Sequence, residues 1–240
     1  SVVTVSLQAP PDPGTDGAEL LCVTSPPVDL FGSLQGTPDA GGSWTSPGGG
    51  AFNGSFAPGT STPGIYTYTV AGTAPCPAAS AVVDVTVMDI PDPGTAGNIT
   101  LCTSGAVQDL FSVLGGAPDA GGTWTAPGGG AHSGAVDPAT DEAGVYTYTI
   151  EVPLPCSSVS STVTVSLQTP PDPGQDGSAV LCISSPPTDL FSSLLGSPDA
   201  GGSWTAPGGG GFNGTFLPGT STTGIYTYTV LGTAPCPLAI

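Results

Sequence analysis

The chain has 240 residues, 18 aspartate and glutamate side chains and one histidine, but neither lysine nor arginine, so its net charge is −18 although only 8% of its residues are charged. Without cationic side chains it cannot neutralise nucleic-acid phosphates, transfer phosphoryl groups through a lysine or arginine finger, or form Schiff bases. No run of about 18 apolar residues occurs, so no membrane insertion is expected. Glycine (38) and proline (28) are abundant, yet 38% of the residues are hydrophobic and clearly patterned, which predicts a packed core.

An 80-residue repeat organises the whole sequence. The string Pro-Asp-Pro-Gly recurs every 80 residues from Pro11, and the tryptophans and both sets of cysteines keep the same interval without insertion or deletion. A unit of this length matches one small domain. We predict three tandem domains, residues 9–88, 89–168 and 169–240, called here the first, second and third repeat.

The local signals within each repeat are those of β-strands. Residues 1–8 alternate valine and leucine with threonine and serine, and residues 65–70 and 83–87 alternate in the same way. Asp29 is the expected N-cap of a short helical turn at 29–34. Clusters of proline and glycine separate the apolar runs as turns. Many short strands, with cysteine, tryptophan and cysteine in that order, predict an all-β chain of immunoglobulin-like sandwiches arranged end to end.

The repeat begins at an unusual phase. Residues 169–240 lack the valine-rich closing strand, whereas residues 1–8 are a closing strand that belongs to a preceding domain or a neighbouring subunit. One interpretation is a window of a longer tandem array. The other is a subunit that joins its own copies head to tail by donor-strand complementation, with Val3, Val5 and Leu7 in the joining strand. Such a contact does not close on itself and builds a filament.

The order of motifs resembles a known group. The motifs are Cys22, Asp29-Leu30-Phe31, Pro38-Asp39-Ala40-Gly41-Gly42-Ser43-Trp44, Gly64-Ile65-Tyr66-Thr67-Tyr68-Thr69-Val70, and Pro75-Cys76 before a valine-rich strand. They resemble the Ig-like (PKD-like) tandem repeats of large secreted surface proteins and adhesins of gliding, Bacteroidetes-type bacteria. The resemblance implies an extracellular, structural or adhesive role. A glycan-coated tandem-repeat extracellular fibre also fits the composition.

Two cysteines occur in each repeat, 54 residues apart. Because each lies beside core strands of its own domain, we predict three bridges within domains: Cys22–Cys76, Cys102–Cys156 and Cys182–Cys236. The repeat symmetry leaves one alternative, with these bridges: Cys76–Cys102, Cys156–Cys182, and Cys236 to Cys22 of the next subunit. Disulfides indicate an oxidising compartment, and therefore an extracellular or cell-surface location. No CxxC motif or ligating histidine is present, so we expect no metal site.

Aspartates recur at three positions of each repeat, represented by Asp12, Asp29 and Asp39. Strings such as Pro-Asp-Pro-Gly are typical of turns, so we interpret these side chains as turn and cap residues. Calcium held by Asp12 and Asp16 at the domain junctions is the alternative, which is weakened because Ala96 replaces Asp16 in the second repeat. No cofactor is expected.

No catalytic set can be assembled from the sequence. His132 is the one candidate general base at neutral pH, but phenylalanine stands at its equivalents, Phe52 and Phe212, which indicates a packing position. Trp44 is expected in a sandwich core rather than on a sugar-binding surface. The chain is therefore predicted not to be an enzyme.

Hydroxyl-rich loops and Asn-X-Ser/Thr strings are candidate glycosylation sites. They are Thr60, Ser61, Thr62, Asn53, Asn98 and Asn213. The predicted function is a structural subunit or segment of an extracellular filament of tandem Ig-like domains. Its expected partners are copies of itself and covalent glycans. The alternative is a cell-surface adhesin stalk or a carbohydrate-binding repeat module.

Overall fold

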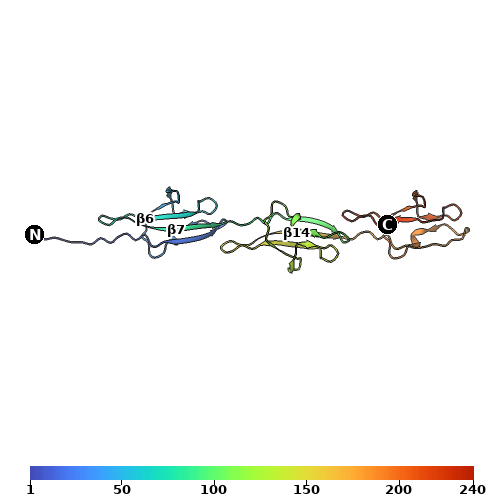
Figure 1. The fold of residues 1–240 in the computed structure, drawn as a ribbon, viewed down its shortest axis with the longest axis horizontal. Helices are drawn as coiled ribbons and strands as arrows, with labels where there is room; N and C mark the ends of the chain where they lie inside the picture. The colour runs from blue at the N-terminus through green and yellow to red at the C-terminus, as the bar shows by residue number, and fades with distance from the viewer. The chain divides into compact units, whose positions relative to one another are not determined.

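A computed structural model describes all 240 residues of the chain. The chain divides into two compact units, one of residues 1–93 with 150–159 and the other of residues 94–149 with 160–240. Apart from three short 3-10 helices, every regular element is a β-strand, as predicted (Figure 1). No helix is long and apolar enough to cross a membrane.

The elements of the first two repeats follow one another at the 80-residue interval. The first repeat contains β1 (Gly17–Cys22), β2 (Val28–Asp29), η1 (Leu30–Ser33), β3 (Ser43–Thr45), β4 (Ala51–Phe52), β5 (Ser55–Phe56), β6 (Gly64–Val70) and β7 (Ala79–Met88). The second contains β8 (Gly97–Cys102), β9 (Gln108–Asp109), η2 (Phe111–Val113), β10 (Thr123–Thr125), β11 (Ala131–His132), β12 (Ala135–Val136), β13 (Gly144–Ile150) and β14 (Val159–Gln168). The third contains β15 (Thr188–Asp189), η3 (Leu190–Ser193), β16 (Ser203–Thr205), β17 (Gly211–Phe212), β18 (Thr215–Phe216) and β19 (Thr227–Thr229).

Each of the first two repeats is an Ig-like sandwich. The larger sheet of the first repeat has the strand order β1-β7-β6-β3-β4, and the pair β2-β5 forms a second, smaller sheet. β1 runs parallel to β7, whereas β6 and β3 pair antiparallel with their neighbours. The second repeat has the same order, β8-β14-β13-β10-β11, with its own pair β9-β12. The predicted all-β sandwich class is thereby confirmed.

The core of the first repeat follows from the alternation of its strands. On β6 the side chains of Tyr66, Tyr68 and Val70 point inward and are buried, while the threonines between them face outward. Trp44 on β3 packs against Tyr68 with ring centroids 5.0 Å apart and is only 8% exposed. The prediction that Trp44 belongs to the core is confirmed. Phe56 on β5 is fully buried on the other side of the core.

The recurring aspartates accept hydrogen bonds from the backbone. The Asp29 carboxylate caps η1 by accepting from the Phe31 N–H at 3.1 Å. Asp12 accepts from the Gly14 N–H at 2.8 Å, and Asp39 accepts from the Asp12 N–H at 2.9 Å. Gly14 has a φ of +77°, a conformation that favours glycine. These carboxylates are therefore turn and cap residues, as predicted.

The third repeat is incomplete as a sheet. It retains the pair β15-β18 and a three-stranded sheet β17-β16-β19, but residues 177–182, the equivalent of β1, form no strand. Beyond β19, the pairing continues only as one isolated antiparallel β-bridge between Val230 and Ala239.

We expect Tyr68→Phe to destabilise the first repeat by about 1–3 kcal/mol, because two backbone groups inside the fold lose their partner. The Tyr68 hydroxyl donates to the Asp39 carbonyl at 2.7 Å and accepts from the Gly42 N–H at 2.8 Å. Native-state hydrogen exchange should show faster exchange in β6, while β13, whose Tyr148 keeps the same bonds, serves as the internal reference. Unchanged exchange in β6 would contradict this assignment.

Candidate functional site

The third repeat carries an open groove of about 520 Å³. Among the side chains that line it are Leu181, Leu190, Trp204, Phe216 and Tyr226. Their five equivalents in the first repeat are all buried, whereas four of the five in the third repeat, all except Leu190, are partly exposed. The groove is therefore a hydrophobic core that has been opened along one side.

The missing piece is the equivalent of β7. In the first repeat β7 lies between β1 and β6, and its Val83 and Val85 are almost completely buried. Residues 169–240 contain no such strand. Residues 177–182 consequently have no ladder partner, and Val180 is 98% exposed. A closing strand that is absent from the middle of a sheet thus exposes both the core and the strand beyond it.

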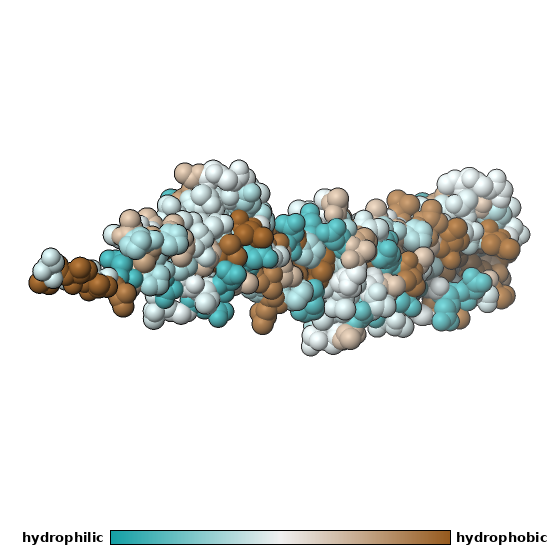
Figure 2. All heavy atoms as spheres, turned by 60° about the vertical axis from the view of Figure 1, so that its left-hand side comes forward, coloured by the Kyte–Doolittle hydropathy of each residue, from teal (hydrophilic) through white to brown (hydrophobic).

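A segment of matching sequence lies elsewhere in the chain, outside any sheet. Residues 1–8 match residues 161–168 of the second repeat at seven of eight positions. Residues 1–8 form no strand, and Val3, Val5 and Leu7 are 85%, 81% and 98% exposed. Figure 2 shows this segment as a projecting run of mostly hydrophobic residues. The third repeat thus has an unfilled strand position, and residues 1–8 match the sequence that fills this position in the second repeat.

The disulfides differ from both predicted pairings. Cys22 bonds to Cys156, and Cys102 bonds to Cys236, with Cα–Cα distances of 5.0 and 4.9 Å. Each therefore joins one repeat to the following one, across 134 residues of sequence. The predicted bridges within domains are wrong, and so is the shifted alternative. Two disulfides are compatible with an extracellular location.

The strand register explains why a bridge within a domain cannot form. Cys22 pairs with Met88 at the end of β7, whereas Cys76 precedes the start of β7 at Ala79. Nine residues of extended strand separate the two ends by about 30 Å. A disulfide requires Cα atoms about 4.4–6.8 Å apart. The two cysteines of one repeat therefore lie at opposite ends of its sheet.

Cys76 and Cys182 remain as free thiols. The Cys76 thiol lies 3.5 Å from the carbonyl oxygen of Gln8, the last residue of the unpaired strand. Cys182 follows the unpaired segment 177–181 and is exposed. A hydrogen bond from the Ser184 hydroxyl lowers the pKa of the Cys182 thiol. Cys76 thus lies beside the end of segment 1–8, and Cys182 ends segment 177–182.

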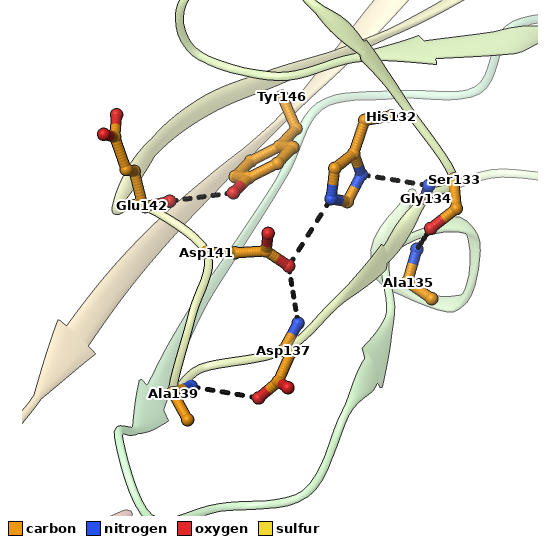
Figure 3. A network of polar contacts seen from close by, with 9 residues as sticks. All are labelled: His132, Ser133, Gly134, Ala135, Asp137, Ala139, Asp141, Glu142 and Tyr146. Atoms are coloured by element: carbon orange, nitrogen blue, oxygen red, sulfur yellow. Dashed lines mark hydrogen bonds and ion pairs between the residues drawn. The ribbon is translucent and has the colours of Figure 1, made fainter.

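His132 occupies a structural position in the second repeat. Its Nδ1 accepts from the Gly134 N–H at 3.0 Å, and its Nε2 lies 3.5 Å from the Asp141 carboxylate, which also accepts from the Asp137 N–H (Figure 3). The imidazole packs against Tyr146 with ring centroids 4.9 Å apart, as Phe52 packs against its tyrosine at 4.5 Å. Because the Nδ1 lone pair is occupied by the backbone, it is not available as a general base.

The other residues that the sequence suggests as sites make separate local contacts and do not come together in one place. Asp16 accepts from the Val82 N–H at 2.8 Å, which connects the chain before β1 to β7. No group of three or more His, Cys, Asp or Glu residues that could hold a metal ion is found. The glycosylation candidates are exposed except Ser61, which is half-buried: Thr60, Ser61, Thr62, Asn53, Asn98 and Asn213. The Asn53 and Asn213 amide oxygens accept backbone N–H bonds within their own turns.

Comparisons with known proteins add little to this description. No protein-family model and no curated protein matches the chain. Among solved structures, a pair of tandem Ig domains from titin aligns with 66% of this chain and 98% of that chain, at 12% sequence identity and a TM-score of 0.24. A similarity this low leaves the Ig-like fold to rest on the strand order and register described above.

We expect His132→Phe to leave the free energy of unfolding of the second repeat within about 1 kcal/mol of wild type, because Phe52 and Phe212 stand at the equivalent positions and pack against the matching tyrosine rings. His132→Ala should cost about 2–4 kcal/mol through the lost ring contact with Tyr146. Thermal unfolding of both variants at neutral pH measures the difference. A phenylalanine variant as unstable as the alanine variant would refute a packing role.

Proposed function

We propose that the chain is a structural subunit of an extracellular filament, in which residues 1–8 of one copy complete the third repeat of the next by donor-strand complementation. The observation that carries this proposal is the match between the open groove and the unpaired strand. The groove lacks the equivalent of residues 161–168, and residues 1–8 repeat that sequence almost without change. Val163 and Val165 of the second repeat are buried, and the equivalent Val3 and Val5 would be buried in the same way in the groove.

The pairing of β7 in the first repeat supports one register for the donated strand. By analogy with β7, Val3 would lie opposite Gly177 on one side and Tyr226 on the other, and Gln8 would lie opposite Cys182. The incoming strand would be parallel to residues 177–182 and antiparallel to residues 224–228. Its inward side chains would then be Val3 and Val5, whose equivalents Val163 and Val165 are buried.

A polar contact supports the same register. In the first repeat the Asp16 carboxylate accepts from the Val82 N–H. Asp176 is the equivalent of Asp16, and it lines the groove. In the proposed register the Asp176 carboxylate would accept a hydrogen bond from the Val2 N–H of the donated strand. The groove thus offers a specific polar partner at the start of the donated strand as well as apolar surface along it.

The free-energy contributions to strand insertion sum to a moderately favourable value. Burying Val3 and Val5 contributes about 1.5–3 kcal/mol each. Net backbone hydrogen bonds add about 1 kcal/mol each along the two new ladders. Association itself costs at least about 4 kcal/mol. Insertion should therefore be favourable and concentration-dependent.

The contact is heterologous, because the donor and the groove are different surfaces of the same chain. Such a contact leaves one free donor and one free groove on every assembly, so it extends rather than closes. A filament outside the cell, with glycans on its exposed hydroxyl and asparagine side chains, agrees with the two disulfides and with the resemblance to surface-protein repeats. The alternative of a carbohydrate-binding module has less support, since Trp44 and Tyr66 are packed inside the fold.

We expect Val5→Asp to abolish head-to-tail assembly, because it would bury an unpaired carboxylate in the groove. Thr4→Asp is the matched control. Thr4 would face outward, and its equivalent in β7 is the exposed Asp84, so this variant should assemble like wild type. Light scattering after size-exclusion chromatography, with electron microscopy of the products, compares the two variants.

A synthetic peptide of residues 1–8 should bind a chain that lacks those residues and protect residues 177–182 from hydrogen exchange. Equal assembly by the Val5→Asp and Thr4→Asp variants, or a peptide that leaves residues 177–182 unprotected, would overturn strand donation.

A further inference from the structure

The two disulfides of the chain are built in the same way, from three groups each. At the first, Cys22 pairs in register with Met88, and the Met88 carbonyl oxygen lies 3.7 Å from the sulfur of Cys156. At the second, Cys102 pairs with Gln168, whose carbonyl oxygen lies 3.2 Å from the sulfur of Cys236. The last residue of the closing strand thus lies in register with one cysteine of each bond and close to the sulfur atom of the other.

A third set of these groups is present in two separate parts. Gln8 ends the unpaired strand, and its carbonyl oxygen already lies 3.5 Å from the sulfur of Cys76. Cys182 stands where the proposed register would place it opposite Gln8. The spacing agrees, since residue 182 plus the 134-residue interval gives 316, which is position 76 of a following copy.

We propose that Cys182 of one copy forms a disulfide with Cys76 of the copy that donates residues 1–8, so that every contact in the filament is covalent. This inference rests on the proposed strand donation. It assigns a role to the two cysteines that the chain leaves unpaired, and it identifies the partner of each as a second copy of the same chain.

The turns that carry both thiols already have the conformation found at the bonded cysteines. The Cys182 N–H donates to the Ser185 hydroxyl at 3.0 Å, as the Cys22 N–H donates to the Ser25 hydroxyl at 3.1 Å. The Cys76 N–H donates to the Thr73 carbonyl at 2.9 Å, and the equivalent Cys236 bond has the same length. Strand insertion therefore has to bring two prepared turns together without rebuilding either.

The chemistry needs an oxidant, which we take to be a low-molecular-weight disulfide such as oxidised glutathione. The Cys182 thiolate attacks one sulfur of that disulfide, forms a mixed disulfide and releases one thiolate. The Cys76 thiolate of the donor then attacks the Cys182 sulfur and releases the second thiolate. Two electrons pass to the oxidant, and the two protein protons end on its two thiols. The lowered pKa of Cys182 favours it as the first nucleophile, because the thiolate is the reactive form.

The test mixes equal amounts of unlabelled and ¹⁵N-labelled full-length chain and oxidises them with glutathione. Non-reducing electrophoresis should give a ladder in steps of the 23.2 kDa chain, which reductant collapses to one band. Pepsin digestion and mass spectrometry should find the Cys76–Cys182 peptide pair, about half of it with one labelled and one unlabelled half.

The Cys76→Ser and Cys182→Ser variants should each lose the ladder in denaturing electrophoresis. Both should still assemble under native conditions, which separates this inference from strand donation. Assembly with both thiols unmodified would overturn the disulfide and leave strand donation intact. A peptide pair in which both halves always carry the same label would also overturn it, since the bond would then lie within one chain. An undiminished ladder from a chain lacking residues 1–8 would overturn the templating role of the strand.

Discussion

In the first repeat, β1 is hydrogen-bonded to the last six residues of β7, and this parallel pairing decides whether the rest of the repeat closes. β7 fills the gap between β1 and β6, so one strand supplies both the valines of the core and the ladder for β1. Residues 177–182 show the result of its absence. They retain the sequence pattern of β1 but form no strand, and Tyr226 and Trp204 behind them lose their cover. Local β-propensity is thus insufficient for this segment, because a strand needs a partner for its backbone.

The absence of lysine and arginine directs the carboxylates toward the backbone. Asp12 and Asp29 accept N–H groups within their own turns, Asp39 accepts one from Asp12, and Asp16 accepts one from the closing strand. Hydrogen bonds to a carboxylate are stronger than neutral ones, so they fix the turns without a cation. The one contact between a histidine and a carboxylate, from His132 Nε2 to Asp141 at 3.5 Å, occurs where an imidazole stands in place of the phenylalanine of the other repeats.

Much of the fold could be predicted from the sequence because its signals are local. The alternation in residues 65–70 predicts which side chains of β6 are buried, and Asp29 before Leu30 predicts the cap of η1. The disulfide pairing could not be predicted from spacing alone, because Cys22 and Cys76 flank the same core yet lie at opposite ends of β7. The pairing depends instead on the parallel register of the first and last strands of the repeat. This register places Cys22 beside Met88, and therefore beside the start of the next repeat. A groove at Leu181 and Tyr226 could not be predicted because these are ordinary core residues, which form a groove only where no strand covers them.

Disulfides between successive repeats change how the chain can unfold. Residues 89–93 connect the first repeat to the second, and the bond from Cys22 to Cys156 connects them a second time. The bond from Cys102 to Cys236 begins before the first loop ends, so residues 102–156 belong to both closed loops. A loop of more than 100 residues contributes about 4–5 kcal/mol by limiting the unfolded chain. Overlapping loops extend this limit across repeat boundaries, so an unfolding repeat remains tied to a folded neighbour. A strand inserted from another copy has no such tie of its own, since its dissociation restores the full entropy of a separate molecule. The weakest contact in a non-covalent filament would therefore be the one between copies, which is where the proposed register would bring Cys76 and Cys182 together.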